Sequence, residues 1–181
     1  MTLGAGMRRT ALTLSLTAAC ALSLMAQTPS TGATPQVHAD MNQLMRGVLY
    51  PAANVLFSPQ FTDPADVKFV PGQDPSMSTD PLTSTYAGWP AIENAAMALA
   101  ESANLLMIPG RRCSNGTPAP SEDPAWAMFV QELRGVSMTA FKVAQAQDLE
   151  KMIALSESLN DACAGCHGKW RNRRTADRCK E

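Results

Sequence analysis

The stretch LEKMIALSESLNDACAGCHGKWR, residues 149–171, decides the fold, because it joins the spacing of an amphipathic helix to a pair of cysteines and a histidine. Side chains three or four residues apart lie on the same face of a helix. Cys163, Cys166 and His167 have this spacing, so their thiols and imidazole should project together. The apolar residues before them keep the same period, which predicts one helix over residues 149–170.

The order Cys-x-x-Cys-His over residues 163–167 is the attachment pattern of haem c. Two thiols on one helical face can reach the two vinyl groups of one porphyrin edge, while the imidazole turns beneath the ring to bind iron. We therefore predict one covalently attached haem c at Cys163 and Cys166, with His167 as an iron ligand. A thiol redox pair and a zinc site are the alternatives, but the first needs a strand–helix context and the second needs another pair of ligands.

Three further amphipathic helices are predicted upstream of this motif. Apolar residues recur at steps of three and four over residues 41–56, 92–106 and 126–144, whereas no segment alternates convincingly in the manner of a strand. Pro51 lies inside the first helix and should kink it, because proline lacks a backbone N–H and clashes with the preceding turn. Four such helices predict an all-α fold, a four-helix bundle.

The connections between these helices differ in length. Residues 58–85 contain five prolines and no periodicity, which predicts a long crossover between the first two helices. Pro109 and Gly110 should end the second helix. Ser121, followed by two acidic residues and Pro124, is a suitable start for the third helix, and the turn from the third to the fourth is very short.

The N-terminal residues have the three parts of a secretory signal: two arginines, an apolar stretch rich in leucine and alanine, and the small residue Ala26. We expect cleavage after Ala26 and export to the periplasm. A membrane anchor is one alternative, but the apolar run is short for a membrane span. A lipoprotein signal ending at Cys20 is another, although apolar residues rather than a polar tether follow it.

The predicted organisation is a signal peptide at residues 1–26, a flexible leader at residues 27–37 and one folded domain at residues 38–181. No membrane span is expected after signal removal. The formal net charge of -1 provides no basic excess for a polyanionic partner. We therefore expect no binding to nucleic acid.

The segment around the cysteines resembles the class II c-type cytochromes, which include cytochrome c′ and its low-spin relatives. The residues that carry the likeness are Cys163-Ala-Gly-Cys166-His167-Gly-Lys-Trp170-Arg171, because the family often places an aromatic and then a basic residue after its attachment pattern. The resemblance implies a four-helix bundle with haem c near the C-terminal end of the last helix. It also implies that Trp170 and Arg171 lie close to the cofactor.

The distal ligand of the iron is less determined, because residues 45–51 depart from the usual pattern of cytochrome c′. In an up-down-up-down bundle the first helix begins at the end where the last helix finishes. We predict Met45 as the sixth ligand, with Met41, His38 or no protein ligand as alternatives. A thioether ligand raises the reduction potential and keeps both oxidation states six-coordinate, which suits electron transfer.

These features predict a periplasmic monohaem electron carrier that serves redox partner proteins and is not an enzyme. The alternative is a five-coordinate haem protein that binds nitric oxide or carbon monoxide. A peroxidase is not expected, because it would need a distal base above the iron. Relatives often pair through their first two helices, so the sequence leaves a homodimer open.

Cys113 and Cys179 are the cysteines that remain after signal removal and haem attachment, and the bundle topology places both at one end. We predict a disulfide between them, with free or intermolecular thiols as the alternative. Arg111 and Arg112, and the basic residues that follow His167, are candidate partners for haem propionates. Four large aromatic residues are expected to fill the core: Trp89, Trp126, Phe129 and Phe141.

Overall fold

The computed structural model describes Met1, residues 34–68, residues 86–171 and Cys179. The chain divides into two units, Met1–Thr34 and Pro35–Glu181, and all the described helices belong to the second. Residues 2–26 of the predicted signal peptide, including Cys20, most of the predicted leader and residues 69–85 of the predicted crossover lie outside the described residues. So do the basic residues beyond Arg171.

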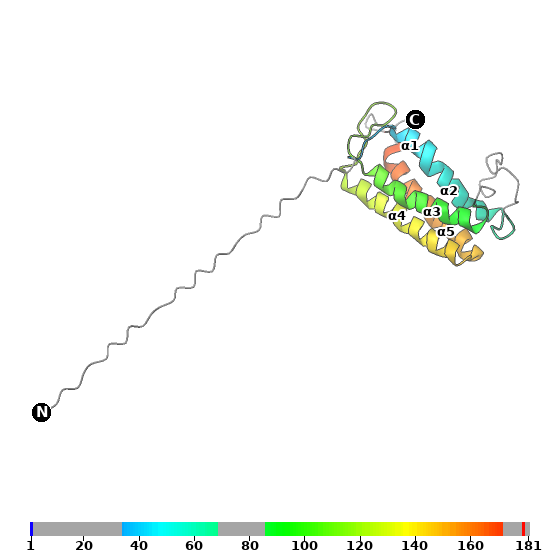
Figure 1. The fold of residues 1–181 in the computed structure, drawn as a ribbon. Coiled ribbons are helices and arrows are strands. Elements are labelled where there is room, and N and C mark those ends of the chain that lie inside the picture. Colours follow the sequence, from blue (N-terminus) through cyan, green and yellow to red (C-terminus); the bar gives the residue numbers. More distant parts are fainter. Residues whose placement is uncertain (2–33, 69–85, 172–178, 180–181) are drawn as a thin grey trace. The chain divides into compact units, whose positions relative to one another are not determined.

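Within the described residues the second unit is all-helical, and its helices pack side by side as a bundle (Figure 1), which confirms the predicted all-α class. The first helical segment runs without a break through α1 (Met41–Leu44), the π-helix η1 (Met45–Leu49), α2 (Tyr50–Phe57) and the 3-10 helix η2 (Ser58–Gln60). The other helices are α3 (Trp89–Leu106), α4 (Pro124–Gln145) and α5 (Leu149–Cys166), which continues into the π-helix η4 (His167–Arg171).

Aspartates cap three of these helices. At α1 the Asp40 carboxylate accepts the Gln43 backbone N–H at 2.8 Å, and the Gln43 side-chain oxygen accepts the Asp40 N–H at 2.9 Å. Asp148 caps α5. Asp123 caps α4, so the expected start at Ser121 was placed two residues too early. The helix begins after Asp123 because the next residue is a proline, whose fixed φ suits the first helical position.

Pro51 was expected to kink the first helical segment; the structure has a π-helical turn, η1, just before this proline. The Tyr50 N–H donates to the Met45 carbonyl, five residues back, in the turn that directly precedes Pro51. A proline in a helix cannot bond the carbonyl four residues before it and its ring clashes with that carbonyl. A wider turn relieves both problems and adds one residue to the helix.

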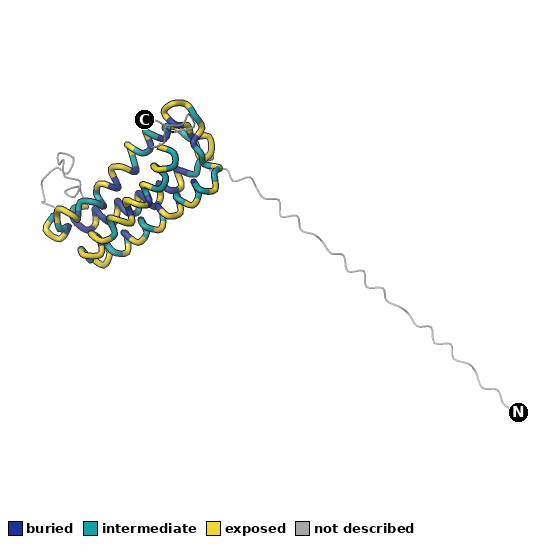
Figure 2. The backbone as a smooth tube through the Cα atoms, turned by 180° about the vertical axis from the view of Figure 1, so that it is seen from behind, coloured by how far each residue is buried: buried dark blue, intermediate teal, exposed yellow. Residues whose placement is uncertain are grey.

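Buried residues from all four helical segments form one core cluster, and Figure 2 shows buried residues alternating with exposed ones along the helices. Trp89 and Trp126 are buried there, as predicted. The Trp126 indole N–H donates to the Leu106 carbonyl at 3.1 Å, so the polar atom of this large side chain is satisfied. Phe141 packs against the core from a half-buried position. Phe129 is half-buried as well, but it is not part of the core cluster or among the residues packed against it, so its expected place in the core was wrong.

Pro64 and Val67, in the described first part of the crossover, pack closely against Gly88, the residue directly before α3. Gly88 has a φ of 70°, in the left-handed region. A Cβ atom at this position would lie 2.5 Å from the Pro64 carbonyl oxygen and 2.7 Å from that of Val67. Glycine satisfies both demands, because it has no Cβ and tolerates a positive φ.

The loop between α3 and α4 is bonded both to the start of α1 and to Cys179. The structure pairs Cys113 of this loop with Cys179 as a disulfide, and their Cα atoms lie 4.6 Å apart, as predicted. The Met41 N–H donates to the Arg112 carbonyl at 2.8 Å, which joins the same loop to the start of α1. In contrast, the connection from α4 to α5 is as short as expected, with Gln147 at a φ of 52°.

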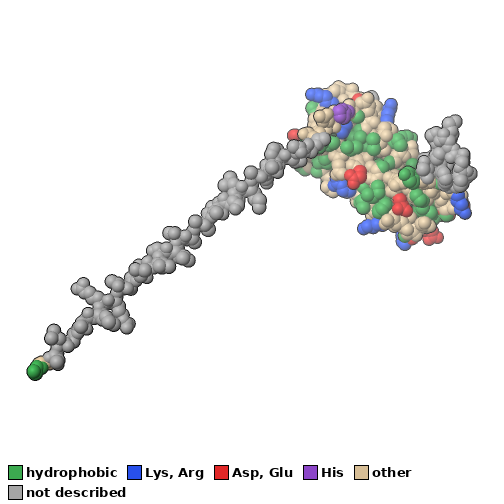
Figure 3. Space-filling model, viewed as in Figure 1, with side chains coloured by type: hydrophobic (Ala, Val, Ile, Leu, Met, Phe, Trp, Pro, Cys, Tyr) green, Lys and Arg blue, Asp and Glu red, His purple; other side chains and the backbone are tan. Residues whose placement is uncertain are grey.

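The visible face of the folded unit mixes hydrophobic side chains with charged ones of both signs (Figure 3). In the part of the chain that the structure describes, no helix is both long enough and apolar enough to cross a membrane.

Candidate functional site

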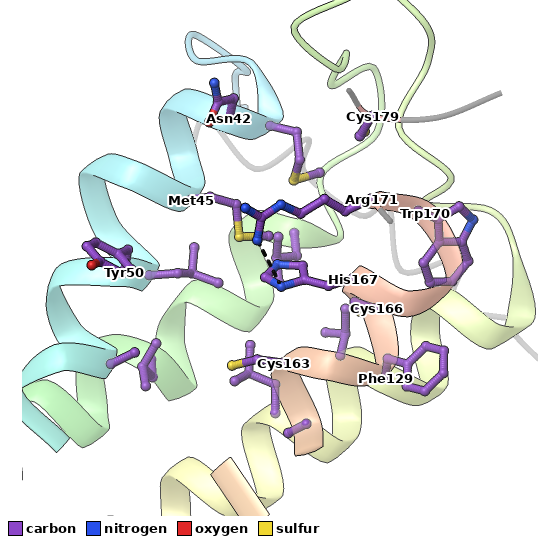
Figure 4. A pocket seen from close by; sticks show the side chains of 18 of the residues that line it. Asn42, Met45, Tyr50, Phe129, Cys163, Cys166, His167, Trp170, Arg171 and Cys179 are labelled. Carbon is purple, nitrogen blue, oxygen red and sulfur yellow. Dashed lines mark hydrogen bonds between the residues drawn. The ribbon is translucent and has the colours of Figure 1, made fainter. Parts of the chain in front are cut away.

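A cavity of about 490 Å³ lies between the first helical segment and the end of α5. One wall is a row of residues four apart on the first helical segment, and the opposite wall comes from α5 and η4 (Figure 4). The rest of the lining comes from apolar side chains of α3 and α4, with Ser114 and Cys179. This volume falls in the range of pockets that hold small molecules and cofactors, about 300–1,000 Å³.

The predicted attachment residues Cys163, Cys166 and His167 all line this cavity. Cys163 and Cys166 belong to the last turn of α5, and His167 is the first residue of η4. All three are half-buried, and both thiols are free. The structure therefore brings the two thiols and the imidazole to one surface, as the helical spacing predicted.

Both thiols lie in surroundings that disfavour the thiolate. Burial raises the pKa of Cys163 above its ordinary value. Burial, with smaller contributions from Cys163 and Glu132, raises the pKa of Cys166 to about 12. Reactive pairs in thiol–disulfide enzymes have lowered pKa values instead. The described residues also contain no group of three or more His, Cys, Asp or Glu side chains placed to hold a metal ion.

The three candidates for a distal ligand lie in different places. Met45 is half-buried, lines the cavity, and points toward the side where His167 lies (Figure 4). Met41 also lines the cavity but is only 5% exposed and belongs to the hydrophobic core. His38 is exposed and is not among the lining residues.

The π-helical turn aligns Met41 and Met45 with the other residues of the first helical segment that line the cavity. In a regular α-helix each residue turns by about 100°, so residues four apart drift around the axis by about 40° per step. The additional residue in η1 offsets part of this drift. The residues of the first helical segment that form the apolar row of the cavity are Met41, Met45, Leu49, Ala53 and Phe57.

The charged side chains that line the cavity are Arg46 and Arg171, and no carboxylate joins them among the described lining residues. A guanidinium N–H of Arg171 approaches the His167 Nδ1 atom at 3.4 Å, and arginine can only donate in this contact. Trp170 lines the cavity too, so both residues that the family resemblance singled out lie at the site. Arg46 was not identified from the sequence, because a single exposed arginine on an amphipathic helix carries no signal of its own.

Arg111 and Arg112 are not at the cavity, contrary to their suggested role as partners of the propionates. Arg111 is only 5% exposed, and its guanidinium donates to the Ala39 carbonyl at 2.6 Å and the Leu105 carbonyl at 3.1 Å. Burial lowers the pKa of Arg111, and the nearby charge of Asp40 partly opposes this. The side chain thus joins the chain before α1 to the end of α3.

Comparisons of the chain with protein-family models, with curated proteins and with solved structures found no match. The assignment of a function rests therefore on the attachment pattern and on the residues that surround this cavity.

Proposed function

We propose that the chain is an exported c-type cytochrome that resembles class II members and carries electrons in the periplasm. The observation that carries this proposal is one cavity with Cys163, Cys166 and His167 on one wall and Met45 on the other. When bound, haem c would supply a one-electron couple between ferric and ferrous iron. The protein would hold the group, orient it and exclude water, and we propose no catalytic residue.

The residues present fit such a group. Two free thiols stand at the spacing that thioether attachment requires, and a neighbouring imidazole faces the same cavity. Sulfur and imidazole donors suit iron. Aliphatic and aromatic side chains form most of the other lining, together with the polar side chains of Asn42, Asn54, Ser114 and Asn160. The Arg46 and Arg171 guanidinium groups at the cavity are suited to the two propionates, since arginine pairs well with carboxylates.

Met45 is the favoured sixth ligand for three reasons. Its thioether lies at the cavity without being fixed in the core as Met41 is. Leu49 and Ala53 follow it along the same row and would keep the distal side dry. A flexible, polarizable thioether needs no polar pocket to reach iron.

Denaturing electrophoresis with haem staining tests the proposal most directly. The full chain, produced in a host with working haem attachment machinery, should retain haem after denaturation and after acid–acetone extraction. The Cys163→Ala/Cys166→Ala variant is the control and should be colourless. An unmodified chain that is colourless under the same conditions would refute the proposal.

The identity of the sixth ligand is tested by optical spectra of oxidised and reduced protein. Met45→Ala should shift the ferric spectrum toward high spin and allow carbon monoxide to bind the reduced form. Met128→Ala is the matched control, because Met128 is 50% exposed on α4 and does not line the cavity. An unmodified protein that is already high-spin and binds carbon monoxide readily would favour the alternative function, gas binding, and leave Met45 as a packing residue.

A further inference from the structure

The aromatic ring of Phe129 occupies the space next to the backbone between the two attachment cysteines. A Cβ atom on Gly165 would lie 2.5 Å from Cε1 and 2.7 Å from Cδ1 of this ring. Real Cβ atoms do not approach other atoms so closely, so a side chain at position 165 would force either the Phe129 ring or the backbone of residue 165 to move. Figure 4 shows Phe129 beside the turn that carries Cys166.

The ring of Phe129 is itself held by other aromatic residues. Trp170 packs edge-to-face against it, with ring centroids 5.9 Å apart and an interplanar angle of 88°. Trp170 in turn contacts Trp126 at 5.1 Å between centroids. Trp126 is buried and hydrogen-bonded to the end of α3, so the contacts run from the core to the motif. Such aromatic pairs are favourable beyond the area they bury.

A second contact joins η4 to the start of α4. The Lys169 ammonium group lies 4.6 Å from the centre of the Trp170 ring and 2.9 Å from the Asp123 carboxylate. Asp123 is the residue that caps α4. Gly165 within the attachment motif, and Lys169 and Trp170 directly after it, therefore lie against α4, while the thiols and the imidazole line the cavity.

We propose that Phe129 is a positioning residue for haem attachment, acting through its contact with Gly165, and that it restricts position 165 of this attachment sequence to glycine. The inference rests on the proposed function. The ring sets how closely the backbone of Cys163–Cys166 approaches α4, because nothing separates it from Gly165. That distance determines where the two thiols and the His167 imidazole stand relative to the opposite wall of the cavity.

The first test compares two phenylalanines of the same helix. Phe129→Ala should lower covalent haem per chain on the order of tenfold, as losses of support around metal ligands do, and should shift the reduction potential of the fraction that carries haem. Phe141→Ala is the matched control, since Phe141 is also half-buried on α4 but does not line the cavity. It should lower thermal stability while leaving haem content and potential unchanged. Phe129→Leu keeps more apolar volume and provides the same comparison if the alanine variant does not fold.

The second test compares two glycines. Gly165→Ala should reduce covalent haem, whereas Gly168→Ala should not, because a Cβ on Gly168 would meet nothing within 4 Å. The double variant Gly165→Ala/Phe129→Ala should contain more haem than the two single losses multiplied together predict, a partial rescue, since removal of the ring makes room for the methyl group. A merely destabilising pair of substitutions would not show this rescue.

Equal haem content, spectra and potentials for the Phe129→Ala and Phe141→Ala variants would overturn the inference while leaving the proposed function intact. Full attachment in Gly165→Ala with an unchanged spectrum would do the same. Absence of covalent haem from the unmodified chain would instead refute the proposed function and this inference with it.

Discussion

Removal of the disulfide by the double substitution Cys113→Ala/Cys179→Ala should lower the free energy of unfolding by about 4 kcal/mol. The two residues are 66 positions apart, and a cross-link over a loop of that length removes chain entropy from the unfolded state worth about this much. In a domain of this size each kcal/mol shifts the melting temperature by about 2–4 °C, so the expected decrease is roughly 8–16 °C.

The position of the bridge adds a local consequence. Cys113 is buried at 3% exposure, and Cys179 lines the cavity. The loop that carries Cys113 also holds the start of α1 through the hydrogen bond from the Met41 N–H to the Arg112 carbonyl. Without the bridge, this end of the bundle should be the first part to open, as measured by hydrogen exchange of the Met41 amide.

Urea unfolding at constant pH, with and without a reductant, measures the effect. The reductant should lower the stability of the unmodified protein to that of the double variant and should leave the double variant unchanged. Thiol titration of the denatured, unreduced haem-bearing protein should detect no free thiol. Two free thiols per chain, or a double variant as stable as the unmodified protein, would refute the argument.

Two further outcomes are expected from the described contacts. Trp126→Phe removes the indole N–H that donates to the buried Leu106 carbonyl and should cost about 1–3 kcal/mol in urea unfolding; a change near zero would show that this carbonyl finds another donor. The hydrogen bond from Lys169, followed by one from a backbone N–H, lowers the pKa of Asp123 below its ordinary value of 3.8. The ionised Asp123 carboxylate therefore stabilises the folded state fully above pH 3.8. This stabilisation is lost as the pH falls through the lower pKa that Asp123 has in the folded state. Asp123→Asn should weaken this acid dependence in a pH series of unfolding curves, and an identical dependence in both proteins would contradict the assignment.

The helices were predictable because their signal is local. Residues 92–106 were predicted as the second helix and α3 spans Trp89–Leu106, while the fourth prediction over residues 149–170 matches α5 with η4. The apolar period of such a segment requires only that one face be buried, whatever it is buried against. The start of α4 was predicted at Ser121, because Ser121 and Asp123 are both good capping residues; Pro124, which suits the first helical position, directly follows Asp123.

The lining of the cavity was harder to predict than its motif. Phe129 shares the spacing of the core residues on α4, yet it contacts Gly165 and Trp170 on another helix. Arg111 was expected near the cavity because its loop lies at that end of the bundle, but its guanidinium turns inward to two backbone carbonyls. In both cases the loop or helix face was known and the direction of the side chain was not.

The sequence by itself predicted the course of the helices, the shared helical face of Cys163, Cys166 and His167, and, on the assumption of haem attachment and signal removal, a bridge between Cys113 and Cys179. Only the tertiary structure decided that Met45 and Arg46 face the motif across a cavity and that Phe129 lies against Gly165. The reason is physical: spacing along a helix depends on the backbone hydrogen bonds within it, which are local. The distance between residues on different helices depends instead on how whole side-chain surfaces fit together, and here also on a π-helical turn that changes the rotation of the first helical segment.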